Sequence, residues 1–85
     1  MAKVEIYTKQ TCPFCIRAKE LLDGKNVSYD EIRIDGDQEK RAAMIARADG
    51  RHTVPQIFIN DEGVGGCDEL HMLDRQGKLD GMLNA

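Results

Sequence analysis

The sequence predicts a single α/β domain with the element order β-α-β-α-β-β-α. Two observations carry this prediction: apolar residues recur with a period of two in some segments and of about 3.6 in others, and 85 residues can bury only one core. We therefore expect one domain over residues 1–85. A strand–helix–strand unit closes as a right-handed parallel crossover, and strands joined by a tight turn pair antiparallel, so we expect a four-stranded mixed sheet flanked by helices.

The first strand is expected over residues 4–8, where apolar and polar residues alternate, and a helix should follow it. Thr11 is the candidate N-cap of this helix, and Pro13 suits its first turn. Gly24 is expected to end the helix with a positive φ angle. The stripe that should pack in the core consists of Phe14, Ala18, Leu21 and Leu22.

A second strand is expected over residues 28–34, because Ile32 and Ile34 share one face of an extended chain. The next helix should start with acidic residues, which interact favourably with the positive end of the helix dipole. It should end between Arg47 and Gly50. Its core face is expected to hold Met44, Ile45 and Ala48. Its solvated face is expected to hold Lys40, Arg41 and Arg47.

The last third of the chain predicts a hairpin followed by helix. Residues 54–59 are expected to form a strand, and residues 60–63 a turn into a short fourth strand. The glycines at 65–66 should lead into a helix that Gly77 ends, and residues 79–83 should add one or two helical turns. Three methionines at helical spacing are expected to serve packing: Met44, Met72 and Met82.

Composition excludes several function classes. Twelve Lys and Arg against fifteen Asp and Glu give a net charge of −3, so the chain lacks the basic field that nonspecific nucleic-acid binding needs. With 41% hydrophobic and 32% charged residues, and apolar runs far shorter than the roughly 20 residues that span a bilayer, a soluble globule without a membrane segment is expected. Glu5 interrupts any N-terminal export signal, so we expect a cytoplasmic protein.

Cys12 and Cys15 are the strongest chemical signal. Three cysteines are an odd number, which does not suit a disulfide scaffold. Residues three apart on a helix are neighbours, so this pair can cycle between dithiol and disulfide. Cys12 should lie at the helix N-terminus, where free backbone N–H groups and the dipole favour a thiolate, and Lys9 adds positive potential. Cys12 is therefore the expected nucleophile, and Cys15, one turn further in, the expected resolving thiol.

A zinc site is the competing interpretation of this cysteine pair. Structural zinc needs four ligands, and the remaining candidates are Cys67, His52 and His71, which lack a second paired spacing. The strand-to-helix context favours redox chemistry instead, and no metal is expected.

Two further segments are expected to line the same site. A cis Val54–Pro55 bond would turn the Val54 backbone toward Cys12, ready to pair with an extended ligand, although Pro55 could also merely open an edge strand. At residues 65–68 the glycines permit close approach, the helix N-terminus offers N–H groups to a carboxylate, and Asp68 can accept from an ammonium. These segments together would hold an α-amino-acid end.

The ordered motifs resemble those of the glutaredoxins, most closely the dithiol, bacterial glutaredoxin-3 type. They cover almost the whole chain: residues 4–9, Cys12-Pro13-Phe14-Cys15, residues 53–59 and residues 65–70. The resemblance implies a thioredoxin fold and an enzyme that uses glutathione as co-substrate to reduce protein disulfides and glutathione mixed disulfides. It implies that glutathione contacts Lys9, Phe14, Arg41, Thr53, Val54, Pro55, Gly66, Cys67 and Asp68.

Within that set the resemblance assigns separate roles. Lys9 and Arg41 would meet the glycine carboxylate, Val54 the cysteinyl backbone, and Cys67 and Asp68 the γ-glutamyl end of glutathione. Cys67 could instead be a third reactive thiol, but burial is the stronger expectation.

The chain departs from the family pattern at three positions. Phe14 replaces the usual Tyr, Ile16 replaces a basic or polar residue, and His52 precedes Thr53. Apart from these departures, two alternative functions stay open: a glutaredoxin-like electron donor reduced by thioredoxin reductase, and an iron–sulfur carrier whose two copies share a cluster. Pro13 and Cys15 argue against the carrier.

The expected partners follow from the same resemblance. They are glutathione, glutathionylated or disulfide-containing proteins with ribonucleotide reductase as a candidate, and glutathione reductase acting indirectly through glutathione. We expect a monomer that binds neither nucleic acid nor membrane.

Overall fold

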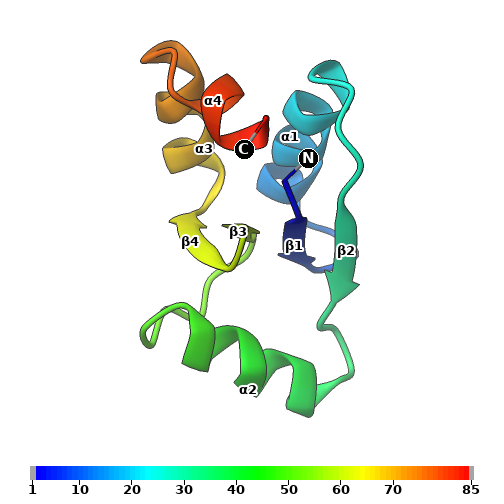
Figure 1. Ribbon diagram of the computed structural model, residues 1–85. Coiled ribbons are helices and arrows are strands. Elements are labelled where there is room, and N and C mark those ends of the chain that lie inside the picture. Colours follow the sequence, from blue (N-terminus) through cyan, green and yellow to red (C-terminus); the bar gives the residue numbers. More distant parts are fainter. Residues whose placement is uncertain (1, 85) are drawn as a thin grey trace.

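Four strands form one mixed sheet in the computed structural model of the protein, which describes residues 2–84. The strands are β1 (Val4–Thr8), β2 (Asp30–Arg33), β3 (Gln56–Ile59) and β4 (Glu62–Gly65). Their spatial order is β2-β1-β3-β4 (Figure 1). β1 runs parallel to β2, whereas β3 pairs antiparallel with both β1 and β4. The predicted mixed sheet is confirmed.

Helices cover both faces of this sheet. They are α1 (Pro13–Gly24), α2 (Gln38–Arg47), α3 (Cys67–Arg75) and α4 (Leu79–Leu83). Figure 1 shows α2 against one face and α1, α3 and α4 together against the other. The predicted element order is confirmed, and the last predicted turns form the short helix α4. Among the described residues, no helix has both the length and the apolar character needed to cross a bilayer.

The core consists of two apolar clusters, one on each face of the sheet. Val4 and Ile6 of β1 point into the cluster shared with α1, α3 and α4, while Tyr7 points into the cluster shared with α2. The two central strands meet across the second cluster, where the Tyr7 and Phe58 rings lie edge to face at 5.8 Å. Burying one such side chain stabilises the folded state by roughly 1.5–3 kcal/mol, so the sheet holds the loops at its ends in fixed positions.

Two expectations about the ends of α1 are wrong. The N-cap is Cys12 rather than Thr11, because the Cys12 backbone is extended and its sulfur accepts the Cys15 N–H. The helix runs through Gly24, and the positive φ angle falls on Asn26, at 58°. The Lys25 and Asn26 N–H groups bond the last carbonyls of the helix and thereby end it. The second strand is also shorter than expected.

Three side chains lie elsewhere than predicted. Phe14 and Met72 are each 51% exposed instead of packed in the core. Phe14 lies in the first turn of α1, where it borders a surface pocket. Arg47 is not simply solvated, because its guanidinium bonds the Glu5 carboxylate at 2.9 Å and lies 4.0 Å from the centre of the Phe58 ring.

Candidate active site

Cys12 lies where the chain leaves the sheet and enters α1. As the N-cap it has extended backbone angles, φ −132° and ψ 102°, and Pro13 follows at the first helical position. Its sulfur accepts the Cys15 N–H at 3.2 Å, while its carbonyl accepts the Ile16 N–H at 3.1 Å. The sulfur therefore satisfies a backbone donor that the helix leaves free, and a thiolate there gains a charge-assisted hydrogen bond.

Cys15 is the more deeply buried thiol of the pair. It is 1% exposed, against 8% for Cys12. Burial, followed by the hydrogen bond with Cys12, raises the pKa of the Cys15 thiol from 9.0 to about 12. A backbone hydrogen bond from Lys9 and the charge of Lys19 act in the opposite direction. Cys15 is thus a protonated thiol at neutral pH in the reduced protein, so the two cysteines are chemically unequal.

The loop before β3 lies beside the Cys12 sulfur. The Val54–Pro55 peptide bond is cis, as predicted, and the Val54 carbonyl accepts a long hydrogen bond of 3.8 Å from the Cys12 thiol. Gln56, which is 2% exposed, braces this loop through its side-chain amide, which donates to the Thr53 carbonyl at 2.9 Å and to its hydroxyl at 3.2 Å. The side chain of Gln56, the first residue of β3, therefore holds the loop in place.

A small cavity of about 150 Å³ joins this loop to the start of α3. It is lined by Phe14, Arg51, Val54, Pro55, Cys67, Asp68 and Glu69. A Cβ atom at Gly66 would lie 3.3 Å from the Pro55 carbonyl, so the two backbones approach closely here. Cys67 is 6% exposed, and burial followed by the charge of Asp68 raises its pKa. The structure thus brings five predicted residues into one pocket and makes Cys67 a buried thiol.

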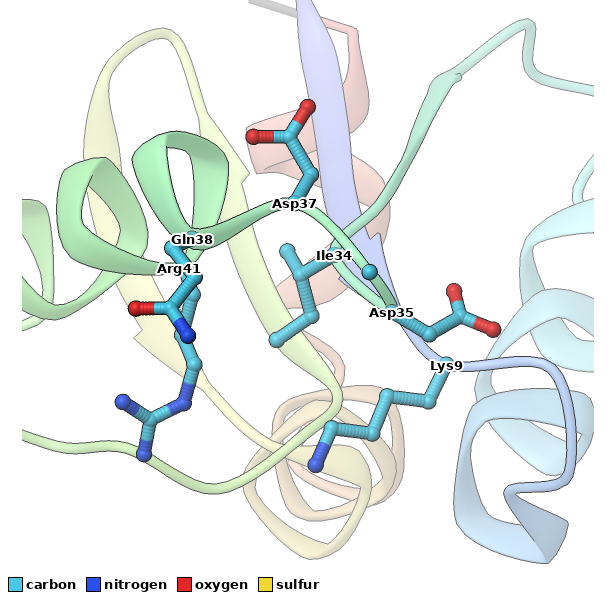
Figure 2. A pocket seen from close by; sticks show the side chains of 7 residues that line it. Lys9, Ile34, Asp35, Asp37, Gln38 and Arg41 are labelled. Carbon is cyan, nitrogen blue, oxygen red and sulfur yellow. The ribbon is translucent and has the colours of Figure 1, made fainter.

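A second and larger cavity, about 510 Å³, lies between the loop after β1 and the start of α2. Its lining residues are Lys9, Ile34, Asp35, Gly36, Asp37, Gln38 and Arg41. Figure 2 shows the Lys9 ammonium and the Arg41 guanidinium extending to the same side of the pocket, while the carboxylates of Asp35 and Asp37 point away from it. The two predicted cations therefore share one pocket with an open, positively charged side that suits a carboxylate.

The acidic residues of this second pocket already have partners. Arg33 holds the pKa of the Asp35 carboxyl at about 2, and the Asp35 carboxylate also accepts the Gln10 N–H at 3.2 Å. Asp37 is the N-cap of α2 and accepts the Lys40 N–H at 3.0 Å. These interactions leave Lys9 and Arg41 free of any ion pair with the pocket's own carboxylates.

The fold adds several lining residues that sequence reasoning did not place in the site, and three of them have polar side chains near the predicted set. Gln38 follows the N-cap of α2 and reaches the second pocket, while Arg51 and Glu69 border the first. Of these three, only Glu69 carried a signal, because an acid three residues after the N-cap of a helix, here Gly66, is typical of a capping arrangement. Among residues 2–84, no group of three or more His, Cys, Asp or Glu side chains lies close enough together to hold a metal ion.

A pair of thiols with unequal burial, at the start of a helix that follows a central strand, defines a dithiol oxidoreductase of the thioredoxin fold. Comparisons with known proteins agree with this class. The glutaredoxin family model matches residues 4–64. A probable glutaredoxin of Synechocystis is 66% identical over 82 residues, which cover 96% of this chain and 75% of the relative.

Two further relatives extend the likeness over nearly the whole chain. Glutaredoxin 3 of Escherichia coli K12 is 59% identical over 98% of this chain and 99% of its own. The crystal structure of a buckwheat glutaredoxin–glutathione complex is 32% identical, with a TM-score of 0.89 over 98% of this chain and 77% of that one. The chain belongs to the glutaredoxin family. It is a glutathione-dependent thiol–disulfide oxidoreductase.

Proposed function

We propose that Cys12 is the nucleophile of this oxidoreductase and Cys15 its resolving thiol. In the monothiol route the Cys12 thiolate attacks the glutathionyl sulfur of a mixed disulfide, and the substrate leaves as a thiolate. A second glutathione thiolate then attacks that glutathionyl sulfur, which forms glutathione disulfide and frees Cys12. In the dithiol route Cys12 attacks a substrate disulfide, and Cys15 attacks the Cys12 sulfur and releases the second substrate thiol.

The observation that carries this assignment is the N-cap position of the Cys12 sulfur. It accepts a helix N–H at 3.2 Å and lies 3.8 Å from the Val54 carbonyl oxygen, whereas Cys15, one turn further into the helix, is only 1% exposed. Attack on a substrate sulfur needs a position that stabilises the thiolate, and Cys12 is also the less buried thiol of the pair. Resolution needs only that the second thiol reach the first, which an i, i+3 spacing on a helix allows.

We further propose that glutathione binds in an extended form along the loop before β3. Its cysteinyl backbone would pair with Val54, with Thr53 and Pro55 on either side. Its γ-glutamyl end would enter the cavity at Gly66, Cys67 and Asp68, with Phe14 as an apolar wall in place of tyrosine. Its glycine carboxylate would face Lys9 and Arg41 in the larger cavity. The complex of the buckwheat relative with glutathione supports this choice of ligand.

The test is NADPH consumption in the presence of glutathione, glutathione reductase and a small glutathionylated disulfide. We expect Cys12→Ser to reduce turnover to the uncatalysed background, because it removes the thiol whose sulfur accepts the helix N–H of Cys15. Cys15→Ser should keep this activity and lose only the reduction of protein disulfides that needs a second thiol. Loss of activity toward the glutathionylated substrate in Cys15→Ser would contradict the assigned roles.

The physiological setting is the remaining part of the proposal. We propose that residues 1–85 act as one monomeric domain in the cytoplasm, where a glutathione pool can keep the site reduced. The substrates would be glutathionylated and disulfide-containing proteins, with ribonucleotide reductase as the first candidate. Trapping of mixed disulfides by Cys15→Ser in cell extract, with Cys12→Ser/Cys15→Ser as the control, would identify them.

A further inference from the structure

A chain of polar contacts connects β1, β2 and the active-site helix through side chains that line neither pocket. The Thr8 hydroxyl, which is fully buried, donates to the Glu31 carboxylate at 2.7 Å. The same carboxylate oxygen binds the Lys19 ammonium at 3.0 Å. The Lys19 and Glu31 side chains are 28% and 31% exposed, so water screens this pair less than a fully exposed one.

The sheet register explains why these three side chains meet. Val4, Ile6 and Thr8 alternate on the face of β1 that α1 covers, and Glu31 on β2 lies across from Ile6 in the parallel pairing. Glu31 therefore points toward α1, on a face whose other strand residues are mostly apolar. A carboxylate there needs partners, and hydrogen bonds from Thr8 and then Lys19 hold the pKa of Glu31 below its ordinary value.

Lys19 follows Cys15 by four residues on α1, so the two side chains lie on the same side of the helix one turn apart. The ionisable groups that act on the Cys15 thiol are Cys12, at the N-cap, and Lys19. Glu31 lies beyond Lys19 on β2, and the neighbouring α3 presents the buried thiol of Cys67. Lys19 is thus the one cation among these groups.

The resolving step creates a charge in this environment. The Cys15 thiol must lose its proton before it attacks the Cys12 sulfur, and burial opposes that loss by raising the Cys15 pKa. In the reduced protein Cys12 disfavours the Cys15 thiolate, whereas Lys19 favours it. In the mixed disulfide Cys12 carries no thiolate, so the unfavourable effect of its charge disappears, while the favourable effect of Lys19 remains. A fixed ammonium near a buried sulfur should lower the barrier to resolution.

We propose that Lys19, held in place by Glu31 and Thr8, is a positioning residue that stabilises the Cys15 thiolate during the resolving step. The proposal rests on the assignment of Cys15 as the resolving thiol. The Cys15 proton leaves to solvent, the Cys15 sulfur forms a bond to the Cys12 sulfur, and the Cys12–substrate disulfide breaks. The substrate leaves as a thiolate that takes up a proton, so atoms and electrons balance without a further reagent.

The experiment follows both chemical steps in the full-length reduced protein with an aromatic disulfide that releases a coloured thiolate. The first release reports attack by Cys12, and the second reports resolution by Cys15. We expect Lys19→Gln to slow the second release about fivefold to tenfold relative to the first, and to move its pH profile toward higher pH. Lys19→Arg, which keeps the positive charge, should restore most of the rate.

Lys25→Gln is the matched control. Lys25 lies at the other end of α1, its side chain is 23% exposed, and its ammonium pairs with Asp74 and Asp80 at 2.6 and 2.9 Å. Its removal breaks comparable ion pairs far from Cys15, so it should not change the ratio of the two release rates.

An unchanged second release in Lys19→Gln would overturn the proposal. So would an equal effect of Lys25→Gln, or an arginine variant as slow as the glutamine variant. A second release that persists in Cys15→Ser would instead refute the resolving role of Cys15, so the two failures are distinguishable.

Discussion

At the scale of single residues, the Glu69 carboxylate holds the start of α3 in place through two short contacts. Its carboxylate accepts the Gly66 N–H at 2.6 Å and the Arg51 guanidinium at 3.1 Å. The Gly66 hydrogen bond is the main reason why the pKa of Glu69 is lowered. Glu69 thereby ties the helix start to residue 51, which precedes the cis-proline loop, and both segments border the smaller cavity.

Gly65→Ala should disturb this arrangement. Gly65 has a φ angle of +108°, and an added Cβ would lie 2.6 Å from the Glu69 carboxylate. We expect the free energy of unfolding, measured with urea, to fall by about 2 kcal/mol or more from backbone strain and this clash together. The KM for a glutathionylated substrate should rise, because the displaced carboxylate lies at the cavity.

Gly77→Ala provides the control for Gly65→Ala. Gly77 also has a positive φ angle, +74°, but an added Cβ would meet no atom within 4 Å. We expect the free energy of unfolding of Gly77→Ala to fall by about 1 kcal/mol from backbone strain alone, with no change in KM. Equal losses of stability in the two variants would show that the contact with Glu69 is unimportant.

At the scale of elements, Arg47 attaches α2 to the sheet. Its guanidinium bonds both Glu5 oxygens, at 2.9 and 3.2 Å, and the Tyr7 hydroxyl at 3.1 Å. It also lies 4.0 Å from the centre of the Phe58 ring, within the range of a cation–π interaction. Hydrogen bonding by Arg47 is the main cause of the lowered pKa of Glu5, whose side chain is only 13% exposed.

Arg47→Ala should therefore lower the stability of the protein more than most substitutions on a helix surface do. It leaves the Glu5 carboxylate without its partner and removes the stacked guanidinium, so we expect the free energy of unfolding to fall by about 2–3 kcal/mol. Lys40→Ala on the same helix should cost less than about 0.5 kcal/mol, because Lys40 is 56% exposed and lies 3.9 Å from Asp37. Similar urea midpoints for the two variants would contradict this role of Arg47.

β1 and α1 show how much of the fold could be predicted from the sequence. The alternation of residues 4–8 and the helical spacing in α1 predicted strand and helix correctly, because local periodicity decides which face is buried. Phe14 has the same spacing but lies in the first turn of the helix, where it is 51% exposed and borders the smaller cavity instead of the core. Thr11 and Cys12 compete for the N-cap, and periodicity cannot say which backbone becomes extended.

At the scale of the whole molecule, the site is assembled from segments distant in sequence. Cys12 was predicted from its motif, but the cavity beside it requires residues 51–55 and 66–69 to approach, and this depends on the antiparallel pairing of β1 with β3. The spacing of residues along the sequence does not show which strands pair, and this is why Arg51 was not predicted to line the cavity. Lys25 provides a second long-range link, because it ties the end of α1 to α3 and α4.

The buried thiols make the stability of the whole reduced protein depend on alkaline pH. Burial raises the pKa of Cys15 from 9.0 to about 12, so the folded state keeps a proton that the unfolded chain releases from about pH 9 upward. The stabilising contribution is therefore fully present below pH 9 and is lost progressively between pH 9 and about 12.

Reduced wild type should thus lose stability at alkaline pH faster than Cys15→Ser, by up to about 1.4 kcal/mol per pH unit. Urea unfolding under reducing conditions, compared between neutral pH and about pH 10, measures this difference. Parallel pH dependence of the two proteins would contradict it. In the disulfide form Cys15 has no proton to lose, so raising the pH should also shift the equilibrium between dithiol and disulfide toward the disulfide.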